Sequence, residues 1–328
     1  MTDDMRAGGF SAVHEAFLRA TAQVEKEMSQ LLALEGGWEE EYITQRLCLS
    51  VVPEVRYARF NKQQEGRVGA DYIWWWVDRS GECYGCLIQA KSIKRNGRKW
   101  RIGFQHPRNT GEQLRSLFET ADVLRIPAGF MLYAGDRDYR AQMGCTSPHA
   151  GRTPCGERDG AAVTLVPALV AEREIPFAEP APWQPDRSAV EVFCQWAKPL
   201  IEVTAPGAYG RSNLYRALDL GDADPRLREF LDTDQVGARK VARHIFDIVG
   251  RMAMGQFAIA VGATPVDSGT ASVFREVPDL RGHFTVPYFE HTLRGLCTEL
   301  PDYVERSLAG NPPPEIVEKV DGIVLVEL

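Results

Sequence analysis

The chain has 328 residues, of which 44% are hydrophobic and 25% are charged, and it carries a formal net charge of −7. This composition is typical of a soluble globular protein. The negative charge excludes a uniformly basic coat for nucleic acid, although a local basic site is compatible with it. The length is sufficient for one large domain or two modest ones.

The N-terminal segment and the cysteine content indicate where the protein works. Residues 1–6 are acidic and polar, no apolar segment follows them, and no apolar run approaches the roughly 18 residues of a membrane span. Seven cysteines, an odd number spread over a long chain, fit a reducing compartment better than a disulfide framework. We therefore expect a cytoplasmic protein that does not associate with membranes.

An apolar heptad pattern opens the chain. Phe10, Phe17, Val24 and Leu31 recur every seven residues, which predicts an amphipathic helix over residues 10–35, ended by two glycines. The apolar stripe would pack either on the protein's own core or on a partner helix in a dimer. The repeat is too short for a convincing coiled coil, which favours the core.

A second helix is predicted over residues 38–51, where it precedes Pro53. At 100° per residue, Glu40 falls on the same face as Ile43 and Leu47. An acid on a core-facing stripe is costly unless a metal ion or a lysine compensates its charge. The alternative is that Glu40 lies at the helix start, where the helix dipole favours a negative charge. The sequence leaves both interpretations open.

The middle of the chain alternates strands and helices. Thr110 and Gln113 form a T-x-x-Q capping box before an apolar stripe, which predicts the start of a helix. The order of elements predicts an α/β fold with a mixed central sheet flanked by helices. The predicted strands cover residues 55–61, 71–78, 83–91 and 129–134, with a hairpin turn at 79–82.

The C-terminal half carries no motif with recognisable chemistry. We divide the chain into an N-terminal amphipathic helix (1–37), an α/β core (38–175) and a mainly helical C-terminal region with a terminal strand (176–328), which begins with a proline-rich linker. The further expected elements are a long loop at 135–160, a strand at 163–170, helices near 187–203, 234–254 and 286–299, and a strand at 322–327.

Two short motifs, Gly69-Ala70-Asp71 and Gln89-Ala90-Lys91, each fall on a predicted strand. Side chains alternate faces along a strand, so Gln89 and Lys91 point to the same side, and Asp71 joins them if the two strands pair. Such oxygen ligands suit a hard cation, Mg²⁺ or Mn²⁺, and the ammonium of Lys91 can orient a water molecule or a phosphate. The spacing therefore predicts a site that holds a divalent cation beside a phosphodiester.

A concentrated run of positive charge follows the second motif directly. Only Glu112 opposes it between residues 91 and 115. A polyanion drawn to this segment would arrive at the predicted cation site, although a charge run is usually only the solvated tip of a hairpin. The position beside the motifs favours phosphate contacts, for which the candidate residues are Lys94, Arg95, Arg98, Lys99, Arg101 and Arg108.

In the order Glu40, Gly69-Ala70-Asp71, Gln89-Ala90-Lys91 and then a helix with Gln113, the chain resembles the PD-(D/E)xK, or restriction-endonuclease-like, nuclease superfamily. Its Gly-Ala-Asp and Gln-Ala-Lys motifs are similar to those of an uncharacterised bacterial branch of that superfamily. The resemblance implies a restriction-endonuclease-like sheet, with Asp71, Gln89 and Glu40 as ligands of Mg²⁺ or Mn²⁺ and Lys91 assisting the attacking water. It also implies that Gln113 touches the site or the DNA, although the capping box explains this glutamine equally well.

The resemblance covers roughly residues 38–135 and implies a metal-dependent nuclease that hydrolyses phosphodiester bonds of DNA, in defence against foreign DNA or in repair. A homodimer would let two such sites address two strands, and a partner protein could bind the C-terminal region. The alternative is a catalytically inactive module that binds nucleic acid or a protein partner. The neutral amide of Gln89 and the acidic net charge favour this alternative.

Two other patterns invite binding hypotheses that the sequence does not favour. Cys83-x-x-Cys86 suggests half of a zinc site, but Cys145 and Cys155 have a poor spacing for the second half, and small residues in a hairpin and a loop are the better interpretation. The run Trp74–Trp76 could stack on bases, but consecutive residues face opposite sides of a strand, which favours core packing.

Overall fold

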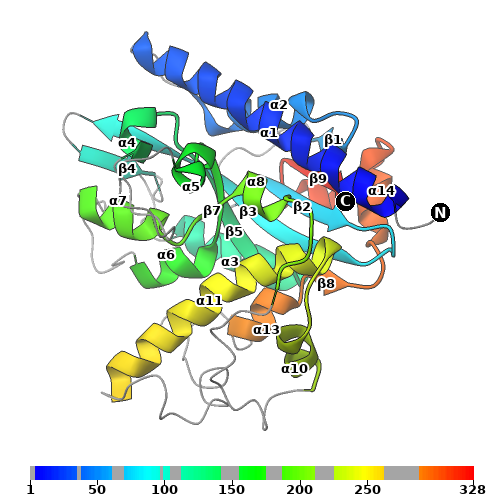
Figure 1. The fold of residues 1–328 in the computed structure, drawn as a ribbon. Helices are drawn as coiled ribbons and strands as arrows, with labels where there is room; N and C mark the ends of the chain where they lie inside the picture. The colour runs from blue at the N-terminus through cyan, green and yellow to red at the C-terminus, as the bar shows by residue number, and fades with distance from the viewer. Residues whose placement is uncertain are drawn as a thin grey trace.

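The computed structural model describes residues 4–34, 38–60, 70–96, 99–103, 112–141, 155–174, 187–210, 225–261 and 288–328. Within them a mixed β-sheet runs through the molecule, and helices pack on both of its faces (Figure 1). The mixed α/β fold predicted from the sequence is therefore confirmed.

The strands are β1 (Val55–Arg59), β2 (Tyr72–Val77), β3 (Cys83–Asn96), β4 (Lys99–Ile102), β5 (Ala128–Tyr133), β6 (Val163–Pro167), β7 (Lys198–Pro199), β8 (Leu296–Cys297) and β9 (Gly322–Glu327). The helices are α1 (Asp4–Ala33), α2 (Glu40–Ser50), α3 (Glu112–Leu124), α4 (Arg137–Ala141), α5 (Gly156–Gly160), α6 (Ala168–Glu174), α7 (Arg187–Cys194), α8 (Leu200–Val203), α10 (Pro225–Asp232), α11 (Gly237–Val261), α13 (Tyr288–Leu293), α14 (Asp302–Leu308) and α15 (Pro314–Val317).

The strands of the described residues form one nine-stranded sheet, whose main path runs β1-β9-β2-β3-β5-β6-β7. The short strands β4 and β8 pair with β3 beside this path. β2 and β3 form an antiparallel hairpin, whereas β5 runs parallel to β3 and β9 runs parallel to β2. The strand that closes the chain thus lies inside the sheet, between β1 and β2, rather than at an edge.

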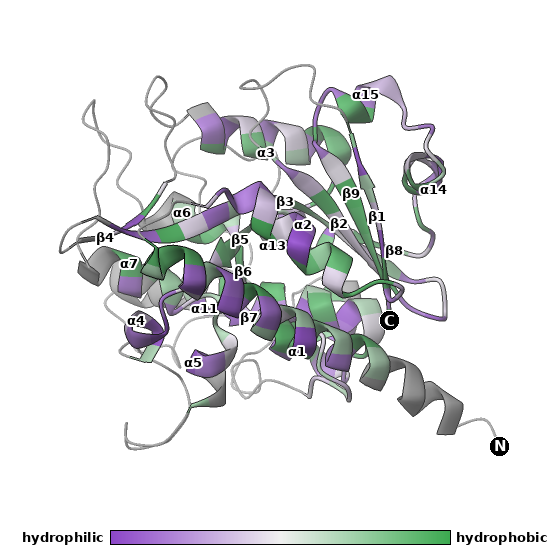
Figure 2. Ribbon diagram, turned by 90° about the horizontal axis from the view of Figure 1, so that it is seen from above, coloured by the Kyte–Doolittle hydropathy of each residue, from purple (hydrophilic) through white to green (hydrophobic). Residues whose placement is uncertain are grey.

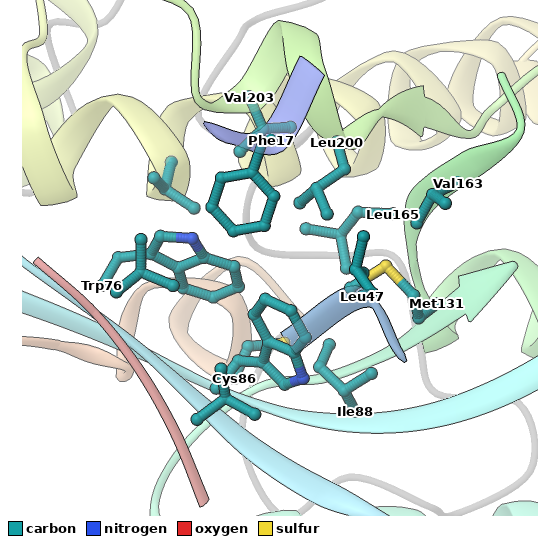
Figure 3. Packing of buried hydrophobic residues seen from close by; sticks show 14 of the residues in the cluster. Phe17, Leu47, Trp76, Cys86, Ile88, Met131, Val163, Leu165, Leu200 and Val203 are labelled. Carbon is teal, nitrogen blue, oxygen red and sulfur yellow. The ribbon is translucent and has the colours of Figure 1, made fainter. Parts of the chain in front are cut away.

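Alternation along β2 assigns its side chains to the two faces of the sheet. Trp74 and Trp76 belong to the core cluster on the α1 and α2 side, where Trp76 lies close to Phe17 (Figure 3). Trp75 belongs to the cluster on the opposite face, with residues of α3 such as Leu117. All three indoles are at most 1% exposed. The prediction that they pack in the core rather than stack on bases is confirmed.

Helix α1 begins at Asp4, earlier than the heptad pattern predicts, and ends at Ala33. Phe17 and Val24 are fully buried in the protein's own core, so core packing rather than a dimer seam accounts for the repeat. Hydrophilic and hydrophobic residues mix along the helix (Figure 2), as expected for a helix that buries one face.

Strand β3 continues past the predicted end at Lys91 to Asn96, and its last residues pair with β4. No strand is predicted from the sequence of this basic segment. Trp100 and Ile102 nevertheless bury their side chains, at 8% and 3% exposure. Apolar residues on one face therefore hold this extension against the core.

The C-terminal region contributes strands to the same sheet. The predicted helix at 187–203 is two helices, α7 and α8, because β7 lies between them and Pro199 lacks the N–H that a helix needs. The strand predicted at 163–170 ends at Pro167, and the helix near 286–299 ends at Leu293 before β8. β9 has the predicted bounds.

A boundary at residue 176 therefore does not divide the sheet, because β7, β8 and β9 follow it and pair with strands that precede it. Part of the predicted long loop is helical, as α4 and α5. Residues 142–154 of that loop, and residues 175–186 of the predicted linker, lie outside the described residues.

Candidate active site at the start of strand β2

Asp71 lies immediately before β2, at the point where two strands begin and a third passes by. Its Oδ2 accepts a hydrogen bond of 2.6 Å from the backbone N–H of Ala90 on β3. Its backbone carbonyl accepts another, of 2.7 Å, from the N–H of Asp321, the residue before β9. β2 and β9 therefore start together, whereas β3 runs on beyond them toward β4.

Gln89 and Lys91 point to the same face of the sheet, as the alternation rule predicts. Their strand neighbours at the same parity, Leu87 and Ile93, belong to the cluster that contains α3. Gln89 is 3% exposed and Lys91 is 7% exposed. Extending the β2–β3 register by one residue places Gln89 opposite Asp71. The pairing of the two motifs, predicted from their spacing, is confirmed.

The ammonium of Lys91 is buried with a neutral partner. Its Nζ donates a hydrogen bond of 3.0 Å to Oε1 of Gln113 on α3. Burial lowers the pKa of Lys91 below its ordinary value, and the charges of Asp71 and Glu40 oppose that shift only in part. Gln113 therefore contacts the site through Lys91. Thr110 lies outside the described residues, so the capping box stays a prediction.

Asp71 experiences the opposite shift. Burial raises the pKa of Asp71 to about 7, against the charge of Lys91 and the hydrogen bond from Ala90. The carboxylates of Asp321 and Glu41 raise it further, because a second negative charge nearby disfavours ionisation. The site therefore holds a carboxylate and an ammonium whose charged forms are both poorly compensated by the protein.

Glu40 is bound to the extension of β3. Its Oε1 accepts hydrogen bonds from the backbone N–H and the hydroxyl of Ser92, and Lys94 Nζ lies 3.8 Å away. Burial raises the pKa of Glu40, but these hydrogen bonds together with the charges of Lys94 and Lys91 lower it overall. Both open interpretations of this acid fit the structure: the charges of Lys94 and Lys91 compensate it in part, and Glu40 is also the first residue of α2, where the helix dipole favours a negative charge.

The carboxylate that α2 brings to Asp71 is that of the next residue, Glu41. Ligand oxygens of Glu41, Asp71 and Asp321 all lie within 4.8 Å of one another, and all three residues are partly exposed. Neither Glu41 nor Asp321 was predicted from the sequence. The available signal was an acid directly before a strand, which Asp321 shares with Asp71.

The chemistry of these donors fits a hard divalent cation such as Mg²⁺ or Mn²⁺. Carboxylate oxygens are the ligands such ions prefer. The oxygens of the three acids, within 4.8 Å of one another, are close enough to bind one ion together. Burial is the main cause of the raised pKa of Asp71, and a bound cation would offset both that cost and the smaller repulsion from Asp321 and Glu41. Asp71, Glu41 and Asp321 would hold the ion, with the neutral amide oxygen of Gln89 opposite Asp71.

A family model matches residues 13–326, from within α1 to the last strand. The chain belongs to DUF6615, a family of unknown function. Neither a search of curated proteins nor a search of solved structures gave a match. Among the helices that the structure describes in this DUF6615 protein, none combines the length and the apolar character needed to cross a bilayer.

The predicted nucleic-acid-binding residues of this DUF6615 protein gather on the extension of β3 and on β4. Lys94 Nζ lies 5.8 Å from the ring centroid of Trp38, and the Arg95 guanidinium lies 6.0 Å from that of Trp100. Both basic residues are exposed. Of the remaining candidates, Lys99 and Arg101 belong to β4, and Arg98 and Arg108 lie outside the described residues.

Cys83 and Cys86 lie on opposite faces of β3, because Cys83 belongs to the α3-side cluster and Cys86 to the α1-side cluster. They cannot both bind one zinc ion, so the structural interpretation of the C-x-x-C pattern is confirmed. Cys145 lies outside the described residues, and Cys155 is buried.

Proposed function

We propose that this DUF6615 protein is a metal-dependent nuclease that hydrolyses phosphodiester bonds of DNA, in defence against foreign DNA or in repair. The observation that carries the proposal is the buried ammonium of Lys91 beside Asp71, at the point where β3 leaves β2. Burying a lysine lowers stability, so a buried lysine in a polar site is a candidate for binding a ligand or for catalysis. The resemblance of the two motifs to PD-(D/E)xK nucleases suggests which reaction this is, the hydrolysis of a phosphodiester.

The carboxylates divide into two roles. Asp71, with Glu41 and Asp321, supplies the oxygen donors for a divalent cation, and Gln89 adds a neutral donor. Bound there, Mg²⁺ would act as a Lewis acid on a phosphoryl oxygen and on the charge that develops during hydrolysis. Glu40 instead orients the extension of β3 through Ser92 and Lys94, which places it as a positioning residue.

In this proposal Lys91 binds the attacking water molecule or a phosphate oxygen. Its ammonium donates to Gln113, which leaves further N–H donors for a water molecule or a phosphate oxygen. Burial lowers the pKa of Lys91, so its ammonium gives up a proton more readily than that of an exposed lysine. Gln113, on helix α3, fixes the position of the flexible Lys91 side chain through this hydrogen bond.

The basic residues of the β3–β4 extension would bring the substrate. Lys94 and Arg95 follow Lys91 on the same strand and expose their charges. Phosphates bound by them would lie along the continuation of the strand that carries the site. An acidic protein can therefore bind DNA locally, without a basic surface elsewhere.

A specific observation favours a second candidate function, a catalytically inactive module that binds nucleic acid or a protein partner. Oδ2 of Asp71 already accepts the N–H of Ala90, which is a structural role at the end of a strand ladder. Gln89 adds no negative charge to attract a cation. In such a module Asp71 would fix the start of β2 against β3, and binding would need no metal.

The test is an incubation with supercoiled plasmid, linear duplex, single-stranded DNA and RNA, each with Mg²⁺, Mn²⁺ or chelator. Lys91→Ala is the inactive variant, and Lys26→Ala, an exposed lysine on α1, is the matched control. Metal-dependent cleavage by the wild type and by the control alone supports a nuclease, and the substrate pattern names its type. Binding that persists with chelator, without cleavage of any substrate, supports the inactive module instead.

A further inference from the structure

Two cysteines face each other across β3 and β8, at the end of β2 away from Asp71. Cys83 and Cys297 are directly paired in the antiparallel register, and both pack against the α3-side cluster. The thiol of Cys83 donates to the carbonyl of Cys297 at 3.5 Å. Both cysteines are free thiols in the structure.

The backbone spacing of the pair is within reach of a disulfide. The N–H of Gly85 donates to the carbonyl of Gly295 at 2.9 Å, so Gly85–Gly295 is a hydrogen-bonded pair, and Cys83–Cys297, two residues further along, is another. Residues in such pairs have Cα atoms about 5.5 Å apart. Disulfides span Cα separations of about 4.4–6.8 Å. The Cβ atoms of directly opposite residues lie about 4.5–5.5 Å apart, and a disulfide needs about 3.5–4.5 Å. Bond formation therefore requires β8, which has only two residues, to move toward β3.

The two thiols differ in reactivity. Cys83 is fully buried, whereas Cys297 is partly exposed. The interaction between the two thiols lowers the pKa of Cys297 to about 7 and raises that of Cys83. By contrast, burial raises the pKa of Cys48 and of Cys194 to about 12. Since the thiolate is the nucleophile, Cys297 is the reactive member of the set.

We propose that Cys297 is an oxidation site for hydroperoxides and that Cys83 resolves the product into a reversible disulfide. The Cys297 sulfur attacks the peroxide oxygen, the O–O bond breaks, and the leaving oxygen takes a proton to give water or an alcohol. The Cys83 thiol then loses its proton and attacks the sulfenic sulfur, which releases water and forms the S–S bond. Two thiols lose two electrons, and the hydroperoxide gains them.

The bond acts on stability rather than on the phosphodiester site. It joins β3 to the segment that leads through α14 and α15 into β9, and it closes a very long loop of chain, which constrains the unfolded state most. Asp71 and Lys91 lie toward the other end of the β2–β3 hairpin. The proposal therefore stands or falls independently of the nuclease hypothesis.

The experiment treats the reduced protein with hydrogen peroxide, blocks free thiols with an alkylating reagent, and maps disulfide-linked peptides by mass spectrometry. A Cys83–Cys297 peptide pair, a fall of two in the thiol count and full reversal by reductant are expected. Alkylation of Cys297 at neutral pH is expected to be at least tenfold faster than that of Cys48 or Cys194. Absence of the linked peptides in the oxidised wild type would overturn the proposal.

A second variant tests the order of events. In Cys83→Ser the sulfenic acid on Cys297 should persist and be trapped by dimedone, whereas Cys297→Ser should give no adduct at Cys83. Adducts at other cysteines in place of Cys297 would refute its role as the reactive thiol. If either variant fails to fold, the peptide map and the alkylation rates of the wild type decide the question by themselves.

Discussion

Two charged clusters of this protein are built in opposite ways. On α11, Arg243 and Asp247 are 1% and 4% exposed and pair at 2.9 Å. The remaining donors of Arg243 reach the carbonyls of Phe230 and Leu231 on α10. At the start of β2, Lys91 has a neutral glutamine as its hydrogen-bond partner, and burial shifts the pKa values of both Lys91 and Asp71 toward neutrality.

The difference separates a structural cluster from a candidate functional one. In the first cluster each of the three guanidinium nitrogens of Arg243 donates to an acceptor, and these bonds connect α11 to α10. Removing one partner of such a buried ion pair lowers stability strongly, because the other charge is left uncompensated. A buried pair that is left poorly compensated lowers stability, and it is retained when a ligand completes it. Each prediction below changes one of these clusters and asks whether stability or activity responds.

The largest effect on stability is expected from Arg243→Met. The substitution leaves Asp247 buried without its partner, so we expect the free energy of unfolding to fall by about 3–5 kcal/mol in urea titrations. Arg19→Met, at an exposed site on α1, should change it by less than about 0.5 kcal/mol. Adding Asp247→Leu to the first variant should recover part of the loss. A loss below about 1 kcal/mol would contradict the structural role of this cluster.

Lys91→Met should behave in the opposite way. It removes an ammonium that burial disfavours, so stability is expected to stay the same or rise. Metal-dependent cleavage of DNA should fall by about 10²–10³-fold, equivalent to roughly 3–4 kcal/mol of transition-state stabilisation. Lys26→Met serves as the matched control in the same cleavage and unfolding assays. A variant that lost stability but retained cleavage would place Lys91 among the structural charges.

Asp71→Asn should stabilise the fold in a pH-dependent way. The pKa of Asp71 is about 7 in the folded state against 3.8 ordinarily, so the folded state favours the protonated form and wild-type stability falls as pH rises between these values. The variant does not titrate, so it should exceed the wild type by about 1–2 kcal/mol at pH 8 and match it near pH 4.

Urea unfolding across this pH range measures the difference, with the exposed Asp232→Asn on α10 as control. Mn²⁺ should narrow the difference at pH 8, because a cation bound by the Asp71 carboxylate stabilises only the wild type. A pH-independent difference would show that Asp71 is not the titrating group.

The smallest effect is expected from Gln113→Leu. The substitution removes the hydrogen-bond acceptor of Lys91, so stability should fall by about 0.5–1.5 kcal/mol and cleavage by up to about tenfold. Gln30→Leu, an exposed position on α1, should leave both unchanged. A loss of cleavage as large as that of Lys91→Met would instead place Gln113 in direct contact with the substrate.

Local patterns predicted much of the fold and part of the site. The apolar run at residues 322–327 predicted β9 with the observed bounds, since a strand covered on both faces is apolar throughout. The spacing of the two motifs predicted that Gln89 and Lys91 share a face beside Asp71, because a short hairpin joins their strands.

The same patterns did not predict features that depend on the exact position of one residue or on contacts with a distant segment. A helix turns 100° per residue, so periodicity could not tell that Glu41 rather than Glu40 joins Asp71. The basic extension of β3 lacked an apolar alternation strong enough to indicate a strand. Its partner strand β4 nevertheless buries Trp100 and Ile102.

The sequence by itself determined the local elements, the shared face of Gln89 and Lys91, and the nearness of a basic segment to them. Only the tertiary structure decided that β9 lies beside β2, which brings Asp321 to Asp71, and that β8 pairs with β3, which brings Cys297 to Cys83. Periodicity reports which face of an element is buried, whereas the partner of a strand is selected by the packing of the whole sheet.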